Sequence, residues 1–175
     1  HRRSAWILIL GHSFVYWVAR HTEWSSWGKD LSSSDQASII WQGRKGIRWS
    51  GVLLSAWHAA QELLPDMLLI HARGNDLGKL SSKAPSKCIM HDLGIWWEWF
   101  PNTHVIWPTM IPRRSWGMGC NPHKLNQACR GVNREVSHEL LKVGGSLGTR
   151  TSALVTWTYI GAMQCTYPAR ALNCF

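Results

Sequence analysis

Apolar runs of strand length alternate along this chain with segments in which apolar residues recur at helical spacing. This alternation is the signature of an α/β protein. The runs predict four strands, at Ala5–Leu10, Ser38–Gln42, Met67–Ala72 and His104–Trp107.

The segments between the strands carry helix signals and helix breakers. Glu23–Gln36 and Lys79–Lys87 are polar and predict loops. The predicted helices are one near Phe14–His21, one capped by Ser50 and stopped by Pro65, one after Lys87 stopped by Pro101, and a long one from Asn121-Pro122 to Gly144-Gly145.

The order of these elements predicts a three-layer α/β/α sandwich around a parallel, flavodoxin-like doubly wound sheet. In such sheets the ligand site lies beyond the carboxyl ends of the strands. The tail, residues 146–175, differs from the rest because it contains no His, Asp or Glu, and Ala153–Ile160 is its one candidate for a fifth strand. We therefore divide the chain into a domain at residues 1–145 and an atypical tail.

Composition narrows the class of protein. The chain has 175 residues, 45% of them hydrophobic, and a formal charge of +9, which predicts a packed core and allows acidic partners. No apolar run approaches the roughly 20 residues that cross a bilayer, so no membrane span is expected. The five Cys include no Cys-x-x-Cys pair, which favours a reducing, intracellular compartment over secretion. Because the chain begins with His, we expect a piece of a longer translation.

Two tripeptides fall where this architecture places active sites. Gly11-His12-Ser13 follows the first strand, and Gly74-Asn75-Asp76 follows the third. A Ser at a strand-to-helix turn lies at a helix N-terminus, where backbone N–H groups favour a developing anion. An Asn side chain aimed at the same point can donate to an oxyanion. Either tripeptide alone is a weak signal, because a Gly-x-Ser turn is more often only the capped start of a helix.

Together, these motifs resemble those of the SGNH (GDSL-like) hydrolases, a superfamily of esterases and lipases. The resemblance implies that Ser13 is the nucleophile, that Asn75 donates to the oxyanion, and that Gly43-Arg44-Lys45-Gly46 is the second block, with Gly46 as its N–H donor. His12 replaces the usual Asp before the Ser. The motif spacing is most similar to the SGNH-like domain of vertebrate retrotransposon polyproteins, over residues 1–145.

One landmark of that superfamily is missing. An Asp-x-x-His block supplies the general base after the last strand, but no Asp or His follows Glu139. Back-translation of Val155–Pro168 in a shifted frame permits Asp-x-x-His across Ala162–Thr166. We therefore hypothesise that the tail is an out-of-frame reading of the native block, and that ester hydrolysis is impaired. No cofactor or metal is expected.

Other residues leave alternatives open. His123 follows the fourth strand and is the best substitute base, whereas His12 is expected to pack against the backbone and His71 to lie in the core.

An alternative function is an RNA-binding accessory domain of a retroelement polyprotein, with no hydrolysis. The basic residues that would contact nucleic acid are Arg44, Lys45, Arg48, Arg113 and Arg114. The simpler interpretation of these five basic residues is that they are scattered over the solvent-exposed surface and bind no nucleic acid.

Overall fold

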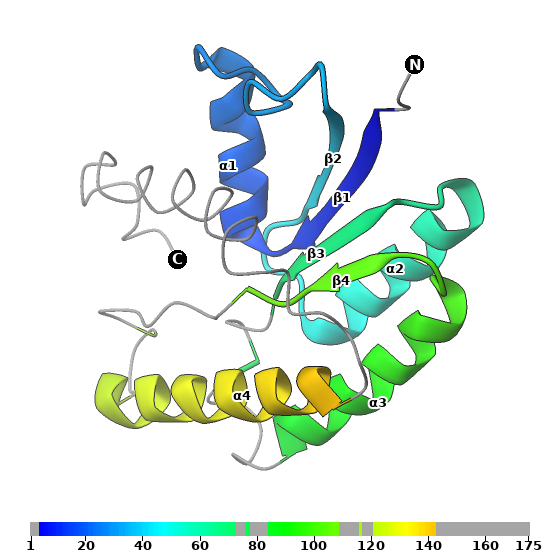
Figure 1. Ribbon diagram of the computed structural model, residues 1–175. Helices are drawn as coiled ribbons and strands as arrows, with labels where there is room; N and C mark the ends of the chain where they lie inside the picture. Colours follow the sequence, from blue (N-terminus) through cyan, green and yellow to red (C-terminus); the bar gives the residue numbers. More distant parts are fainter. Residues whose placement is uncertain (1–3, 73–75, 78–83, 109–115, 117–120, 143–175) are drawn as a thin grey trace.

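The structure, a computed structural model, describes residues 4–72, 76–77, 84–108, 116 and 121–142. The tail from residue 143, Asn75, Arg113 and Arg114 lie outside these residues, so the predictions made for them stay predictions. The elements, shown in Figure 1, are β1 (Ala5–Gly11), α1 (Ser13–Trp24), β2 (Ala37–Gly43), α2 (Trp49–Glu62), β3 (Met67–His71), α3 (Ala84–Trp99), β4 (His104–Ile106) and α4 (Pro122–Lys142).

The four strands form one parallel sheet in the order β2-β1-β3-β4. The chain starts at an inner strand, moves to one edge, and then crosses back to build the other side. This is the flavodoxin-like order, and it confirms the predicted fold class. All four predicted strands are present, with ends that differ by at most one residue.

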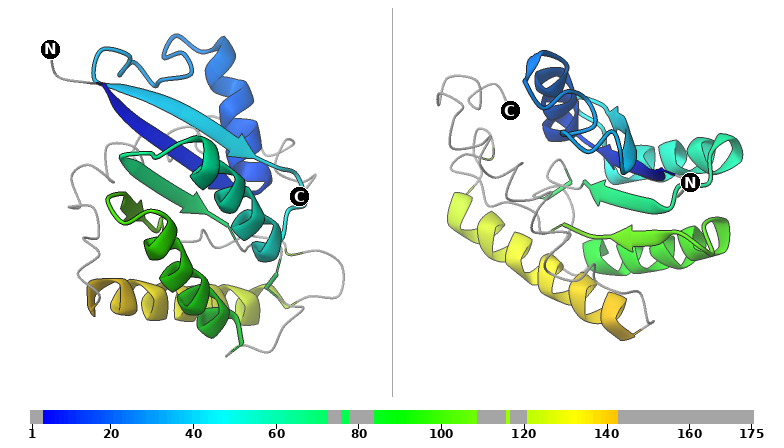
Figure 2. Two further views of the ribbon diagram at one scale, coloured as in Figure 1. Left: turned by 90° about the vertical axis from the view of Figure 1, so that its right-hand side faces the viewer. Right: turned by 45° about the horizontal axis from the view of Figure 1, so that its top comes forward.

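Successive residues of β1 face opposite sides of the sheet, which produces two separate cores. Leu8 and Leu10 pack with buried side chains of α2, α3 and α4. Ile9 packs on the other face with Val15 and Val18 of α1. Figures 1 and 2 show α1 on one side of the sheet and α3 and α4 on the other. The described residues therefore form three layers, with the sheet in the middle.

The long helix α4 starts as the sequence predicts. The backbone N–H of Lys124 donates a 3.1 Å hydrogen bond to Oδ1 of Asn121, which lies immediately before Pro122, the first helical residue. Asn thus satisfies an N–H that has no partner within the helix, and Pro occupies a position where its missing N–H costs nothing.

Two other predicted helix starts are wrong. Ser50 is not a cap, because α2 begins at Trp49 and the residue before it, Arg48, makes no side-chain capping bond. Helix α3 begins at Ala84, inside the segment 79–87 that was predicted to be a loop. Pro85 contributed to the loop prediction, but proline is well tolerated in the first turn of a helix.

None of the helices in the described ranges combines the length and apolar character that crossing a membrane requires. Both cysteines in those ranges, Cys88 and Cys129, are free thiols.

Candidate active site at the carboxyl edge of the sheet

Three strands end side by side at one edge of the sheet. Gly11, the last residue of β1, pairs in register with Gly43 of β2 and with His71 of β3. Two backbone hydrogen bonds continue this pairing beyond the strands, from Arg44 N–H to the Gly11 carbonyl (3.0 Å) and from His12 N–H to the His71 carbonyl (3.3 Å). The segments that carry Ser13, Gly46 and Asn75 therefore all leave from the same edge.

Two glycines allow the first turn of α1 to lie close to this edge. A Cβ on Gly43 would meet the backbone N of Tyr16 at 2.1 Å, and a Cβ on Gly11 would meet the His71 carbonyl oxygen at 2.3 Å. Since real Cβ atoms do not approach backbone so closely, both positions need glycine. The sequence motif Gly11-His12-Ser13 thus has a packing reason for its glycine.

Ser13 is the first residue of α1 and is only 6% exposed. Its backbone N–H belongs to the first turn, where helix N–H groups have no acceptor within the helix. Within the described part of the chain, neither this N–H nor the Ser13 hydroxyl forms a hydrogen bond. Ser13 thus presents an open donor and a hydroxyl at a helix N-terminus, which favours an anion.

His12 caps this helix. Its Nδ1 accepts a 3.2 Å hydrogen bond from the backbone N–H of Phe14, the second helical residue. The prediction that His12 packs against the backbone is confirmed. Because Nδ1 is the acceptor in this bond, it is not available to receive the Ser13 proton.

His71 is buried, as predicted, and its ring lies among aromatic neighbours. The ring centroids are 5.0 Å from His12 and 4.7 Å from Phe14. The end of β3 therefore packs against the start of α1 through side chains as well as backbone. His123, the residue predicted as the best substitute base, is exposed in the first turn of α4.

Gly46 lies in a tight turn of the second block. The N–H of Ile47 donates to the Arg44 carbonyl across a four-residue turn, in which Gly46 is the third residue with φ +69°. A positive φ at this position is typical of a type II turn and strongly favours glycine. Gly46 thus has a conformational reason to be glycine, independent of the oxyanion role that the resemblance implies.

Lys45, the second residue of that turn, contacts the first helix. Its Nζ lies 4.2 Å from the ring centroid of Trp17 and 4.8 Å from that of Tyr16. Cation–π attraction therefore holds the second block against α1. Arg44 and Arg48 are exposed on either side of it. Among the residues that the structure describes, Lys45 therefore differs from these two arginines by having aromatic partners.

Asp76 is a residue of this edge whose role the sequence analysis missed. Its side chain is buried, and Oδ2 accepts a 3.0 Å hydrogen bond from the backbone N–H of Trp49, the first residue of α2. A carboxylate from the third block therefore caps the helix that follows the second block. The residues at the start of α2 offer no such acceptor themselves, because Arg48, in the cap position, makes no side-chain capping bond and the first turn of α2 has no acidic residue.

Trp49 is fixed by further contacts. Its indole Nε1 donates a 2.5 Å hydrogen bond to Asp92 of α3. Its ring packs in the core against Trp96 and Trp107, with centroid distances of 5.3 and 5.7 Å. Asp76 is thus bonded to a rigid element, and it holds the end of the Gly74-Asn75-Asp76 motif against the start of α2.

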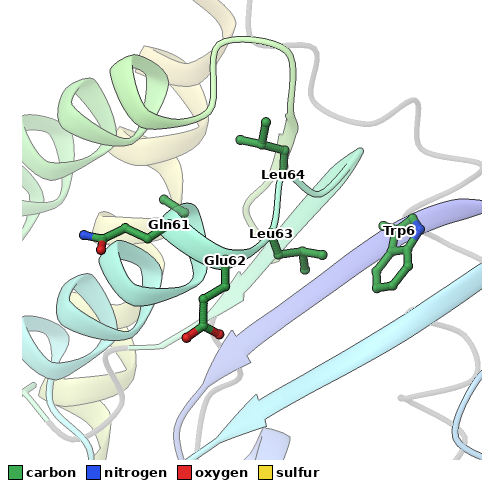
Figure 3. A pocket seen from close by; sticks show the side chains of 6 residues that line it. Trp6, Gln61, Glu62, Leu63 and Leu64 are labelled. Carbon is green, nitrogen blue, oxygen red and sulfur yellow. The ribbon is translucent and has the colours of Figure 1, made fainter.

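A cavity of about 520 Å³ lies elsewhere, at the opposite end of β1 (Figure 3). It is lined by Trp6, the second residue of that strand, and by residues 60–64 at the end of α2. It is therefore not part of the carboxyl edge. No group of three or more His, Cys, Asp or Glu side chains in the described ranges could hold a metal ion.

Comparison of the fold with solved structures finds esterases and lipases. An acylhydrolase from Bacteroides fragilis matches with a TM-score of 0.63 and 17% identity, over 82% of this chain and 66% of that protein. A GDSL-like lipase from Bacteroides thetaiotaomicron matches with a TM-score of 0.64 and 15% identity, over 80% and 65%. A variant of the esterase AlinE4 matches with a TM-score of 0.61 and 15% identity, over 96% and 99%.

These likenesses establish the fold, which is that of the GDSL-type hydrolases. The chain spans about two thirds of the length of the two Bacteroides proteins. Searches against protein-family models and curated sequences find no match.

Proposed function

We propose that the carboxyl edge is a serine ester hydrolase site of the SGNH type, with Ser13 as its nucleophile. The observation that carries the proposal is the position of Ser13. It opens α1 two residues after the point where β1 pairs with both neighbouring strands, and its N–H is open. The fold shared with GDSL-type hydrolases supports the same assignment.

In the proposed chemistry the Ser13 oxygen attacks the carbonyl carbon of a carboxylic ester. The carbonyl oxygen becomes an oxyanion, which the N–H groups of Ser13 and Gly46 and the side chain of Asn75 stabilise. Collapse of the intermediate expels the alcohol and leaves an acyl group on Ser13, which water then removes. Formation of the acyl group requires a base that takes the Ser13 proton and gives it to the departing alcohol. Its removal requires a base that takes a proton from water and gives it back to Ser13.

The chain lacks the usual source of that base. No His or Asp follows Glu139, and the described residues place no imidazole in a hydrogen bond with Ser13. Without the base, the oxyanion donors and substrate binding supply only part of the catalysis. In a well-studied serine hydrolase this part is a rate enhancement on the order of 10³–10⁴ relative to the reaction in water. We therefore infer that hydrolysis by this chain is weak or absent without an added base. The retroelement-like origin and the shifted reading frame of the tail are part of the same proposal.

The test is hydrolysis of p-nitrophenyl acetate with increasing imidazole, which can replace a missing base. The chain is compared with Ser13→Ala and with Ser50→Ala, a control serine exposed on α2. The rate that imidazole alone produces without protein is subtracted first, because imidazole itself hydrolyses this ester. We expect the remaining rate to rise with imidazole in the unaltered chain and in Ser50→Ala, and to be absent from Ser13→Ala.

Two results would contradict parts of the proposal. Equal rates for all three proteins at every imidazole concentration would rule out Ser13 as the nucleophile. Turnover at about 1 s⁻¹ or faster without imidazole, which is ordinary for an enzyme, would show that the chain already contains its base.

A further inference from the structure

Helix α4 presents a stripe of basic and amide side chains on its outer face. His123, Gln127, Arg130, Arg134 and His138 are all exposed. They are spaced four, three, four and four residues apart, so at about 100° per residue they lie within one narrow sector of the helix. The stripe spans about 22 Å along the helix axis, from its first turn to His138, about one turn before its end at Lys142.

Acidic side chains do not lie beside the arginines of the stripe, although Glu139 lies 3.4 Å from the His138 ring at its C-terminal end. Glu135 and Glu139 are the acidic residues of α4, and they fall about 100° or more from Arg134 around the helix. The first turn of α4 contains no acidic residue, so the positive end of the helix dipole adds to the field there.

The two arginines of the stripe have no ion-pair partner among the described residues. Arg20 on α1 differs, because it lies 3.7 Å from Glu23. The positive charge of Arg130 and Arg134 is therefore not neutralised by a neighbouring carboxylate and attracts anions from solution.

The stripe also borders a hollow. A cavity of about 430 Å³ is lined by His123, Gln127, Arg130, Gly131 and Arg134. Gly131 has no side chain, and nothing lies within 4 Å of where its Cβ would be. The residues that line this space thus include two arginines, a histidine and a glutamine, whose side chains can donate hydrogen bonds to an anionic group.

We propose that this face of α4 binds the phosphate backbone of a nucleic acid without reading its bases. Guanidinium groups form paired hydrogen bonds with phosphate oxygens, and Gln adds a neutral contact. No Trp, Tyr or Phe belongs to the stripe, so the extensive base stacking that accompanies many single-strand sites is not expected here.

A membrane surface fits this face less well. Peripheral helices insert apolar side chains beside their basic residues. On α4 the apolar residues Val132, Val136 and Leu140 are buried in the core of the protein, on the side away from the stripe. The outer face therefore offers a binding partner mainly electrostatic contacts and hydrogen bonds. Electrostatic attraction dominates the binding of proteins to a nucleic-acid backbone.

The test is fluorescence anisotropy with a labelled single-stranded RNA of mixed sequence, measured from about 50 to about 200 mM salt. The whole chain is compared with the double variant Arg130→Gln/Arg134→Gln and with Arg20→Gln, which removes an exposed arginine elsewhere. We expect the double variant to bind about fivefold or more weakly at low salt, and its salt slope to fall by about 1.4 for two lost phosphate contacts. Arg20→Gln is expected to bind like the unaltered chain.

The proposal would be overturned if the chain does not bind RNA at low salt, or if the double variant binds RNA as tightly as the unaltered chain. It would also be overturned if binding is lost only in Arg44→Gln/Arg48→Gln, which would place the contact at the carboxyl edge. Binding of vesicles that contain phosphatidylserine, with the same loss in the double variant and no RNA binding, would assign the face to membranes instead. Melting temperatures of the variants show whether each is folded.

Discussion

The carboxylate of Asp76 and the backbone N–H of Trp49 form a hydrogen bond of 3.0 Å that joins segments 27 residues apart. It connects the motif after β3 with the helix that follows β2. Trp49 is itself held by Asp92 and by the aromatic rings around it. The neighbour of Asp76 in the chain is Asn75, the proposed oxyanion donor, so this bond fixes one end of the motif on which that role depends.

Replacing Asp76 by Ala removes the cap of α2 and leaves a buried N–H without a partner. We expect the free energy of unfolding to fall by about 1–2 kcal/mol, as for loss of a helix cap. Denaturant unfolding monitored by far-UV circular dichroism measures this change.

Two controls identify the cause. Asp76→Asn keeps an acceptor oxygen and is expected to lose less stability than Asp76→Ala. Asp35→Ala changes an exposed carboxylate and is expected to stay within about 0.5 kcal/mol of the original chain. Equal stability of Asp76→Ala and Asp35→Ala would show that the bond contributes nothing.

The two glycines of the second block are expected to respond differently to substitution. In Gly43→Ala the new methyl group meets backbone atoms of Tyr16 and Val15 at 2.1–2.6 Å, so unfolding free energy should fall by about 3 kcal/mol. In Gly46→Ala the methyl group meets nothing within 4 Å, and only the positive φ opposes it, at about 1 kcal/mol. Parallel urea titrations compare them, and a larger loss in Gly46→Ala would contradict the packing described for Gly43.

Lys45 is expected to stabilise the fold through its aromatic contacts. Lys45→Met keeps most of the aliphatic chain but removes the charge near the Trp17 and Tyr16 rings. We expect a loss of about 0.5–1 kcal/mol, which is typical of an exposed cation–π contact. Lys29→Met is the matched control, because Lys29 is exposed and its side chain has no such ring contact among the described residues. If both variants unfold at the same urea concentration, the ring contact has no energetic role.

The shifted-frame hypothesis for the tail is tested by the encoding DNA. Val155–Pro168 should be encoded by codons whose shifted reading contains Asp-x-x-His across Ala162–Thr166. Codons that cannot encode this string in the shifted frame would end the hypothesis, and the absence of the base would then need another origin.

The strands and the sheet order were predictable because their information is local and strong. Apolar runs such as Ala5–Leu10 lie between turn residues, and the alternation with helices leaves few ways to connect parallel strands. The start of α4 was predictable for a similar reason, since Asn121 caps a helix only three residues away.

The start of α2 was not predictable in the same way. Local preference favoured Ser50, but the acceptor for the first N–H comes from Asp76, which is distant in sequence and near only in the folded chain. The difference between Gly43 and Gly46 also depends on tertiary structure. One glycine is needed for the approach of another element, and the other for its own backbone angle.

The most direct test of the proposed site is a crystal structure that resolves Ser13, Gly46 and Asn75 together. We expect one position about 3 Å from the backbone N–H of Ser13, the N–H of Gly46 and the amide of Asn75, with the Ser13 hydroxyl beside it. An Asn75 side chain directed away from Ser13, or a Ser13 hydroxyl closed off from any such position, would contradict the assignment of this edge as an esterase site.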